Sequence, residues 1–253
     1  MALQKTEAII LRRRHFGDNS LIFTFYTRDH GKIAALAKGA KMRISRGEGG
    51  LEILSQVELI YYEKESRTLR LVNHCYLLDS FAALRGDLIK FAYASYLIEM
   101  VDRLVHGEEK NENIYELLLA ALKRLKTETE IKRLVHFVEI KLITFLGYGP
   151  YLTNCNQCHK KDLGPHPLFT PASGGVICSS CHRKKKEEGI IIHKISLLQF
   201  LEKADFETLS RLKISEADEK ELKSVLQSYL QTLLGDKPLR TLKVISSLFP
   251  CLT

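Results

Sequence analysis

The stretch TEAIILRRRHFGDNSLIFTFYTRDHGKIAALA, residues 6–37, decides the fold of the first part of the chain. It holds three short runs of apolar, β-branched and aromatic residues, at 6–11, 20–27 and 32–37. Residues 29–31, Asp-His-Gly, are typical of a tight turn and separate the last two runs. This pattern predicts three consecutive strands.

Two further runs of the same kind follow after a loop, QVELIYY at 56–62 and TLRLVNHCY at 68–76. Five strands in so short a segment favour a small β-barrel over a layered α/β fold, in which strands alternate with helices. The loop, KGAKMRISRGEGG at 38–50, is basic and rich in glycine. We therefore expect a barrel domain over residues 1–79.

The apolar residues change to helical spacing after the last of these strands. Thr127 and Glu130 have the spacing of a capping box, which predicts the start of a helix, and a glycine and a proline further on predict its end. The predicted helical segments are 80–105, 112–126, 131–146, 196–213, 216–234 and 238–249. We expect them to form one all-α domain from residues 80–150 and 190–253.

Two C-x-x-C pairs, Cys155 with Cys158 and Cys178 with Cys181, interrupt this helical region and predict a module over residues 151–189. Thiolates at this spacing on two tight turns can occupy the four corners of a tetrahedron, which is the geometry of zinc. Because four protein ligands leave no position for substrate, the pattern predicts a structural zinc ion. Two disulfides or four unligated thiols are the alternatives. One of three nearby histidines could also replace a sulfur ligand: His159, His166 or His182.

The formal net charge of the 253-residue chain is +8, and the excess is concentrated in two regions. Residues 1–46 hold ten Lys or Arg against three acids, and residues 155–188 hold six against three, which gives +7 and +3. Segregated positive charge is typical of proteins that bind a polyanion such as nucleic acid. A basic face that is only solvated is the alternative.

The chain lacks the sequence patterns of several enzyme classes. It has no phosphate-binding loop of the G-x-x-x-x-G-K-[ST] type, no H-E-x-x-H motif, no nucleophile elbow and no deaminase signature beside its cysteines. We therefore expect a protein that is not an enzyme. No apolar run approaches the ~20 residues that span a bilayer, and no signal peptide is recognisable, so a cytoplasmic location is expected.

Several segments carry a resemblance to one known family. Residues 138–150, VEIKLITFLGYGP, lead into the first cysteine pair, and residues 169–181, FTPASGGVICSSC, contain the second. The N-terminal part contributes EAIIL at 7–11, FGDNS at 16–20, Asp-His-Gly at 29–31 and Lys-Gly at 38–39. In these segments, and in the order of its modules, nearly the whole chain resembles the family of the bacterial recombination mediator RecO.

This resemblance implies a multidomain α+β protein with an N-terminal OB-fold barrel, followed by an all-α domain with an inserted four-cysteine zinc module. Members of the family bind single-stranded and double-stranded DNA and anneal complementary strands. Together with RecR they help to load RecA onto DNA coated with single-stranded-DNA-binding protein, whose acidic C-terminal tail they contact. Some members lack the zinc-binding cysteines, so the implied role of the metal is structural. The implied role is DNA repair by recombination, at the nucleoid in the cytoplasm.

Candidate DNA contacts come from both basic regions. On the barrel, the candidate phosphate contacts are Arg12, Arg13, Arg14, Lys38, Lys41, Arg43 and Arg46, and all of these except Arg13 are predicted to share in DNA binding. In an alternating strand, Arg13 opposes the face that Arg12 and Arg14 share. Phe23 and Phe25 are expected in the core, which makes Tyr26 the better candidate for base stacking. The second cationic surface is predicted after the last cysteine, at Arg183, Lys184, Lys185 and Lys186.

Two other functions are alternatives at this point. A zinc-dependent hydrolase of nucleic acid is the enzyme alternative, although a closed four-sulfur site opposes it. An adaptor that binds only proteins is the other, because a basic face can also dock an acidic peptide. The segregated charge favours DNA binding over both.

Overall fold

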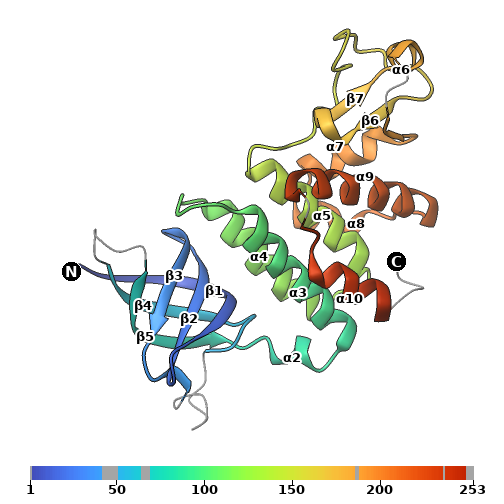
Figure 1. Cartoon of the computed structure of the whole chain (residues 1–253). Helices are drawn as coiled ribbons and strands as arrows, with labels where there is room; N and C mark the ends of the chain where they lie inside the picture. Colours follow the sequence, from blue (N-terminus) through green and yellow to red (C-terminus); the bar gives the residue numbers. More distant parts are fainter. Residues whose placement is uncertain (1, 42–50, 64–68, 186–187, 236, 249–253) are drawn as a thin grey trace. The chain divides into compact units, whose positions relative to one another are not determined.

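The computed structural model describes residues 2–41, 51–63, 69–185, 188–235 and 237–248 (Figure 1). The chain divides into two compact units by its contacts. Unit 1 comprises Met1–Thr129 together with Leu239–Thr253, and unit 2 comprises Glu130–Pro238. Unit 2 is therefore an insertion in unit 1, and each unit is described by itself below. Arg43, Arg46 and Lys186 lie outside the described residues, as does the side chain of Lys185.

Unit 1 begins with five strands: β1 (Ala2–Phe16), β2 (Ser20–Thr27), β3 (Gly31–Ala37), β4 (Gln56–Glu63) and β5 (Arg70–Asp79). β1 pairs with both β2 and β4, and β5 pairs with β4 and, in parallel, with β3 at Ala35 and Leu36. These pairings close the sheet into a barrel in the order β1-β2-β3-β5-β4. The five strands and the barrel are thus as predicted, but β1 is longer at both ends, because residues 2–5 pair with β4 and residues 12–16 pair with β2.

The interior of the barrel is filled by alternate residues of the strands. Phe23 and Phe25 are both fully buried there, with ring centroids 5.9 Å apart, which confirms their predicted place in the core. The pairing of β1 with β2 shifts register between Ile10 and Arg12, so Leu11 is an extra residue in β1. Such a bulge bends a strand and redirects the side chains that follow it.

Four described helices complete unit 1: α2 (Ala82–Arg85), α3 (Leu88–Leu104), α4 (Glu112–Leu125) and α10 (Arg240–Leu248). The single helix predicted over 80–105 was wrong, because the chain breaks at Gly86 and Asp87. The Asp87 side chain accepts hydrogen bonds from the backbone NH groups of Ile89 and Lys90, at 3.0 and 3.1 Å, and so caps α3. Glu99 of α3 likewise accepts from the first backbone NH groups of α10.

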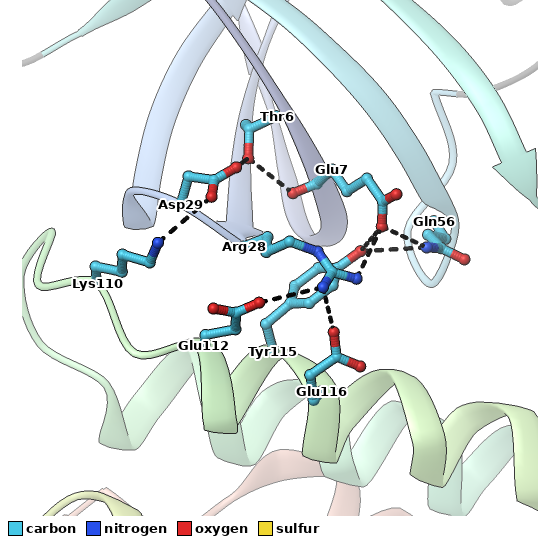
Figure 2. Close-up of polar contacts among 9 residues, drawn as sticks. All are labelled: Thr6, Glu7, Arg28, Asp29, Gln56, Lys110, Glu112, Tyr115 and Glu116. Carbon is cyan, nitrogen blue, oxygen red and sulfur yellow. Dashed lines mark hydrogen bonds and ion pairs between the residues drawn. The ribbon is translucent and has the colours of Figure 1, made fainter.

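One arginine joins the barrel to α4 (Figure 2). The guanidinium group of Arg28 lies 3.2 Å from Glu7 of β1 and, on α4, 3.3 Å from Glu112 and 2.5 Å from Glu116. Its Cζ atom also lies 4.8 Å from the centre of the Tyr115 ring, whose hydroxyl donates to Glu7. We call these five residues the Arg28 clamp. It fixes the outer face of the barrel against α4.

Unit 2 packs helices against a small sheet. Its elements are α5 (Ile131–Phe145), β6 (Leu168–Thr170), the 3₁₀ turn η1 (Pro171–Ser173), β7 (Gly175–Ile177), α6 (Ser179–Lys185), β8 (Ile190–Ile191), α7 (Ile195–Lys203), α8 (Phe206–Arg211) and α9 (Glu216–Leu234). The strands pair antiparallel in the order β7-β6-β8. Among the described residues, no helix is long and apolar enough to cross a membrane.

Two local predictions for unit 2 were wrong. The capping box of Thr127 and Glu130 is not formed, because Thr127 bonds back to the carbonyl of Arg124 and the start of α5 has no side-chain cap. The helix predicted over 196–213 divides into α7 and α8. Asp205 lies between them, and its carboxylate accepts from the backbone NH of Thr208, which starts a new helix.

Candidate metal centre and nucleic-acid interface

The hairpin of β6 and β7 brings the two cysteine pairs together. Cys178 follows β7 directly, and the backbone NH of Asn156 donates to the carbonyl of Val176 at 2.8 Å. A further bridge joins Tyr151 to Gly175. A Cβ atom on Gly175 would lie 2.3 Å from the side-chain nitrogen of Asn156, so only glycine permits this approach. The first cysteine turn is therefore held against β7.

The four sulfur atoms form one cluster. Those of Cys155, Cys158, Cys178 and Cys181 all lie within 4.8 Å of one another, and no histidine belongs to the cluster in the described part of the chain. The sulfurs of Cys158 and Cys178 are 3.7 Å apart. This separation agrees with the ~3.8 Å edge of a tetrahedron whose Zn–S bonds are about 2.3 Å long. It is much longer than a disulfide bond of about 2.05 Å, and all four are free thiols.

The surroundings of the sulfurs favour a cation. Burial opposes ionisation of Cys155, but hydrogen bonds from backbone NH groups, including that of Cys178 at 3.3 Å, lower the pKa of its thiol to about 6. Hydrogen bonding with the neighbouring sulfurs, first with Cys178, raises the pKa of Cys181 to about 12. Four thiolates can therefore share this space only around a positive ion. The donor set suits a closed, tetrahedral metal site without an open position.

The described basic residues of the barrel are accessible to a ligand. Arg12, Arg14 and Lys38 are exposed, and Lys41 is half-buried, with its ammonium group donating to the carbonyl of Gly17 at 3.2 Å. Arg12 lies 3.5 Å from Asp102 of α3, so part of its charge is already paired. The register of β1 and β2 places Arg12 opposite Thr24 and Arg14 opposite Ile22. Arg12 and Arg14 therefore share one face of the strand.

The prediction that Tyr26 stacks on bases was wrong. Its side chain is fully buried, and its hydroxyl donates to the carbonyl of Asn111 at 3.1 Å. Burial raises the pKa of Tyr26 to about 12. Exposed rings lie elsewhere on the barrel, at Phe16 and at Tyr76, which is 53% exposed and stacks on His74 with centroids 5.8 Å apart. Sequence analysis missed these rings, because their exposure depends on how the strands close.

The second predicted cationic surface lies on α6, directly after the cysteine cluster. Arg183 and Lys184 are exposed, and the Nε atom of Arg183 donates to the carbonyl of Ser179 at 3.3 Å. This bond lies within the helix, so the guanidinium group keeps its other donors. The cysteine cluster fixes the start of the helix that carries these two cations.

The chain matches two family models, recombination protein O N terminal over residues 1–81 and recombination protein O C terminal over 85–243. The DNA repair protein RecO of Syntrophus aciditrophicus is 31% identical over 252 residues, which cover 98% of this chain and 96% of that protein. The DNA repair protein RecO of Heliobacterium modesticaldum is 30% identical over 258 residues, covering 100% and 93%. None of these names denotes an enzyme, in agreement with the sequence prediction. The chain therefore belongs to the RecO family of recombination proteins.

Proposed function

We propose that this protein is a DNA-binding recombination mediator in DNA repair, which holds strands without making or breaking covalent bonds. The observation that carries the proposal is a full-length family match combined with an exposed basic face on a closed five-stranded barrel. Such cations neutralise phosphate groups of the DNA. The release of the counterions that had condensed on the DNA then drives binding. Binding to both single-stranded and double-stranded DNA is proposed, because both present a chain of phosphate groups that such cations can contact.

The barrel is proposed to be an OB-fold. Five strands closed as β1-β2-β3-β5-β4 support this, because the OB-fold is a five-stranded Greek-key barrel that binds oligonucleotides. Phosphates would lie along Arg12, Arg14, Lys38 and Lys41, with bases against exposed rings such as Tyr76. In this proposal the helical segments 80–150 and 190–253 form the scaffold, and 151–189 is the zinc module.

A structural zinc ion is proposed for the four cysteines. They suit it in number, spacing and thiol chemistry. When bound, the ion would offset half of the charge of four thiolates and pin the first cysteine turn to the start of α6. Arg183 and Lys184 on that helix then form the second cationic surface. Two such surfaces on one chain can each hold a strand and screen the repulsion between complementary strands while they pair, which is the proposed basis of annealing.

The proposed partners follow from the family. They are RecR, single-stranded-DNA-binding protein through its acidic tail, and indirectly RecA, at the nucleoid in the cytoplasm. The basic faces support contact with an acidic tail as well as with DNA.

A strand-annealing assay on DNA coated with single-stranded-DNA-binding protein tests activity and partner together. We expect faster pairing of complementary oligonucleotides with the protein than without it, and no cleavage of labelled DNA with Mg²⁺ or Zn²⁺. An absence of DNA binding at low ionic strength would contradict the proposal. Strand cleavage would instead indicate the hydrolase.

A further inference from the structure

A pocket in unit 1 shares only Arg12 and Arg13 with the candidate contacts named from the sequence. Its volume is about 570 Å³, and it is lined by β1, residues 52–54, α2, α3 and α10. Pockets that bind small organic groups usually measure about 300–1,000 Å³. Leu11, Arg12 and Arg13 all line this pocket, directly at and after the bulge in β1. We call it the arginine pocket.

The wall of the arginine pocket is partly apolar and open to solvent. Phe91 on α3 is 38% exposed and Ile53 is 41% exposed, although most large apolar side chains of unit 1 are buried. Leu11 and Leu54, both buried, lie behind them. An accessible phenyl ring beside a concave apolar surface is suited to a flat ring, because aromatic faces stack on nucleobases.

The carboxylates of the arginine pocket are already engaged. Glu52 pairs with Arg85 at 3.3 Å. Asp102 pairs with Arg12 at 3.5 Å. Glu99 accepts hydrogen bonds from the backbone NH groups of Arg240 and Thr241, at 2.9 and 2.8 Å. These acids therefore repel an incoming anion less than free carboxylates would.

Two guanidinium groups of the arginine pocket are unengaged. Among the described residues, no hydrogen bond or ion pair is formed by the side chain of Arg13, on β1, or of Arg240, on α10. Both residues are exposed, and they reach the pocket from separate elements. A guanidinium group binds phosphate or carboxylate through two parallel hydrogen bonds. The pocket can therefore hold an anion between two arginines.

We propose that the arginine pocket receives one nucleotide of a single DNA strand, with its phosphate held by Arg13 and Arg240 and its base stacked on Phe91. This inference rests on the proposed function. A strand is favoured over an acidic peptide because the basic run continues past the pocket along β1, through Arg14 and His15. A polyanion with regularly spaced phosphates can follow that run, whereas a short acidic segment uses the pocket alone.

The test measures binding of a fluorescein-labelled oligo(dT) to the full chain by anisotropy, at a series of NaCl concentrations. Arg13→Ala and Arg240→Ala should each weaken binding and reduce the slope of log K against log salt by about 0.7, one phosphate contact. Phe91→Ala should weaken binding about 5- to 150-fold and leave the slope unchanged, because stacking releases no counterions.

Matched controls lie on the same helices. Lys243→Ala removes an exposed cation of α10, and Leu88→Ala removes a side chain of α3 that is 58% exposed; neither residue lines the pocket. Both controls should bind with wild-type affinity and slope. Thermal unfolding of every variant shows whether it is folded.

The outcomes separate the two proposals. If the wild-type protein binds DNA and folded pocket variants behave like the controls, the arginine pocket is not a nucleotide site, while the proposed function stands. If the wild-type protein does not bind DNA at all, the proposed function is contradicted, and the nucleotide site that rests on it is contradicted with it. If a labelled peptide of alternating Asp and Leu binds the wild type and not Arg13→Ala or Arg240→Ala, and these variants bind DNA normally, the pocket belongs to a peptide.

Discussion

Replacing Arg28 by Met should destabilise unit 1 by about 1.3 to 4.5 kcal/mol. The substitution removes three ion pairs, to Glu7, Glu112 and Glu116, each worth about 0.2–1 kcal/mol because Arg28 is 30% exposed. It also removes the contact with the Tyr115 ring, worth about 0.5–1 kcal/mol. Glu112 and Glu116 are one helical turn apart and would then repel each other, by about 0.2–0.5 kcal/mol.

The assay is urea denaturation followed by far-UV circular dichroism, with the transition of unit 1 compared between variants. Arg211→Met is the matched control, because within the described ranges Arg211 pairs only with Glu207 on its own helix and both side chains are about three-quarters exposed. It should change stability by at most about 0.5 kcal/mol. A double-mutant cycle with Glu116→Gln isolates the shortest pair of the Arg28 clamp.

Equal effects of Arg28→Met and Arg211→Met would refute this reasoning. The carboxylates would then be solvated well enough without Arg28, and burial alone would hold the barrel against α4. A loss well above about 4.5 kcal/mol would also contradict it, because partly exposed contacts of this kind do not supply so much.

Three further outcomes are expected. Reversing Lys38 and Lys41 to Glu should weaken binding of single-stranded DNA and flatten its salt slope by about 1.4 in total, measured by anisotropy titration; an unchanged slope would remove both lysines from the interface. Purified protein should contain one zinc ion per chain by elemental analysis, and a chelator should lower its thermal unfolding temperature; Cys178→Ser should start at the lower temperature and not respond to the chelator. Burial lowers the pKa of His136, but a hydrogen bond with Glu139 at 2.8 Å and the carboxylate of Glu219, 3.7 Å from Nε2, raise it to about 9 in the folded chain. The stabilising contribution of His136 is therefore complete below pH ~6.5 and is lost as the pH rises through 9. The free energy of unfolding, measured by urea denaturation, should therefore fall more between pH 6 and pH 9.5 in the wild type than in His136→Ala. The extra loss in the wild type should be at most about 3 kcal/mol.

The strands were predictable because their residues are β-branched and aromatic, and β2 matches its predicted bounds of 20–27. The composition of β2 also explains why Tyr26 was wrongly predicted to be exposed. All but the first residue of β2 are buried, since the barrel interior covers one face and helices of unit 1 cover the other. A continuous run of apolar residues indicates burial on both faces of a strand. Such a run has no alternation of polar and apolar residues from which an exposed ring could be identified.

The C-terminal end of β1 was missed because its residues lack the apolar pattern of a strand. Residues 12–16 are polar or exposed and carry no strand signal of their own, but they form a ladder with β2. The grouping of the four cysteines could be predicted, because they stand in two local motifs whose spacing sets their geometry. The arginine pocket could not be, because residues from β1, α3 and α10 meet there only after folding.

The return of α10 to unit 1 has a consequence for the order of synthesis. Glu99 caps the start of α10, so this contact of α3 can form only after α10 has been synthesised. On the ribosome, all of unit 2 emerges before the residues that complete unit 1. The cysteine-bearing insert can thus fold before unit 1 is complete, because unit 1 needs α10, which follows the whole insert in the sequence.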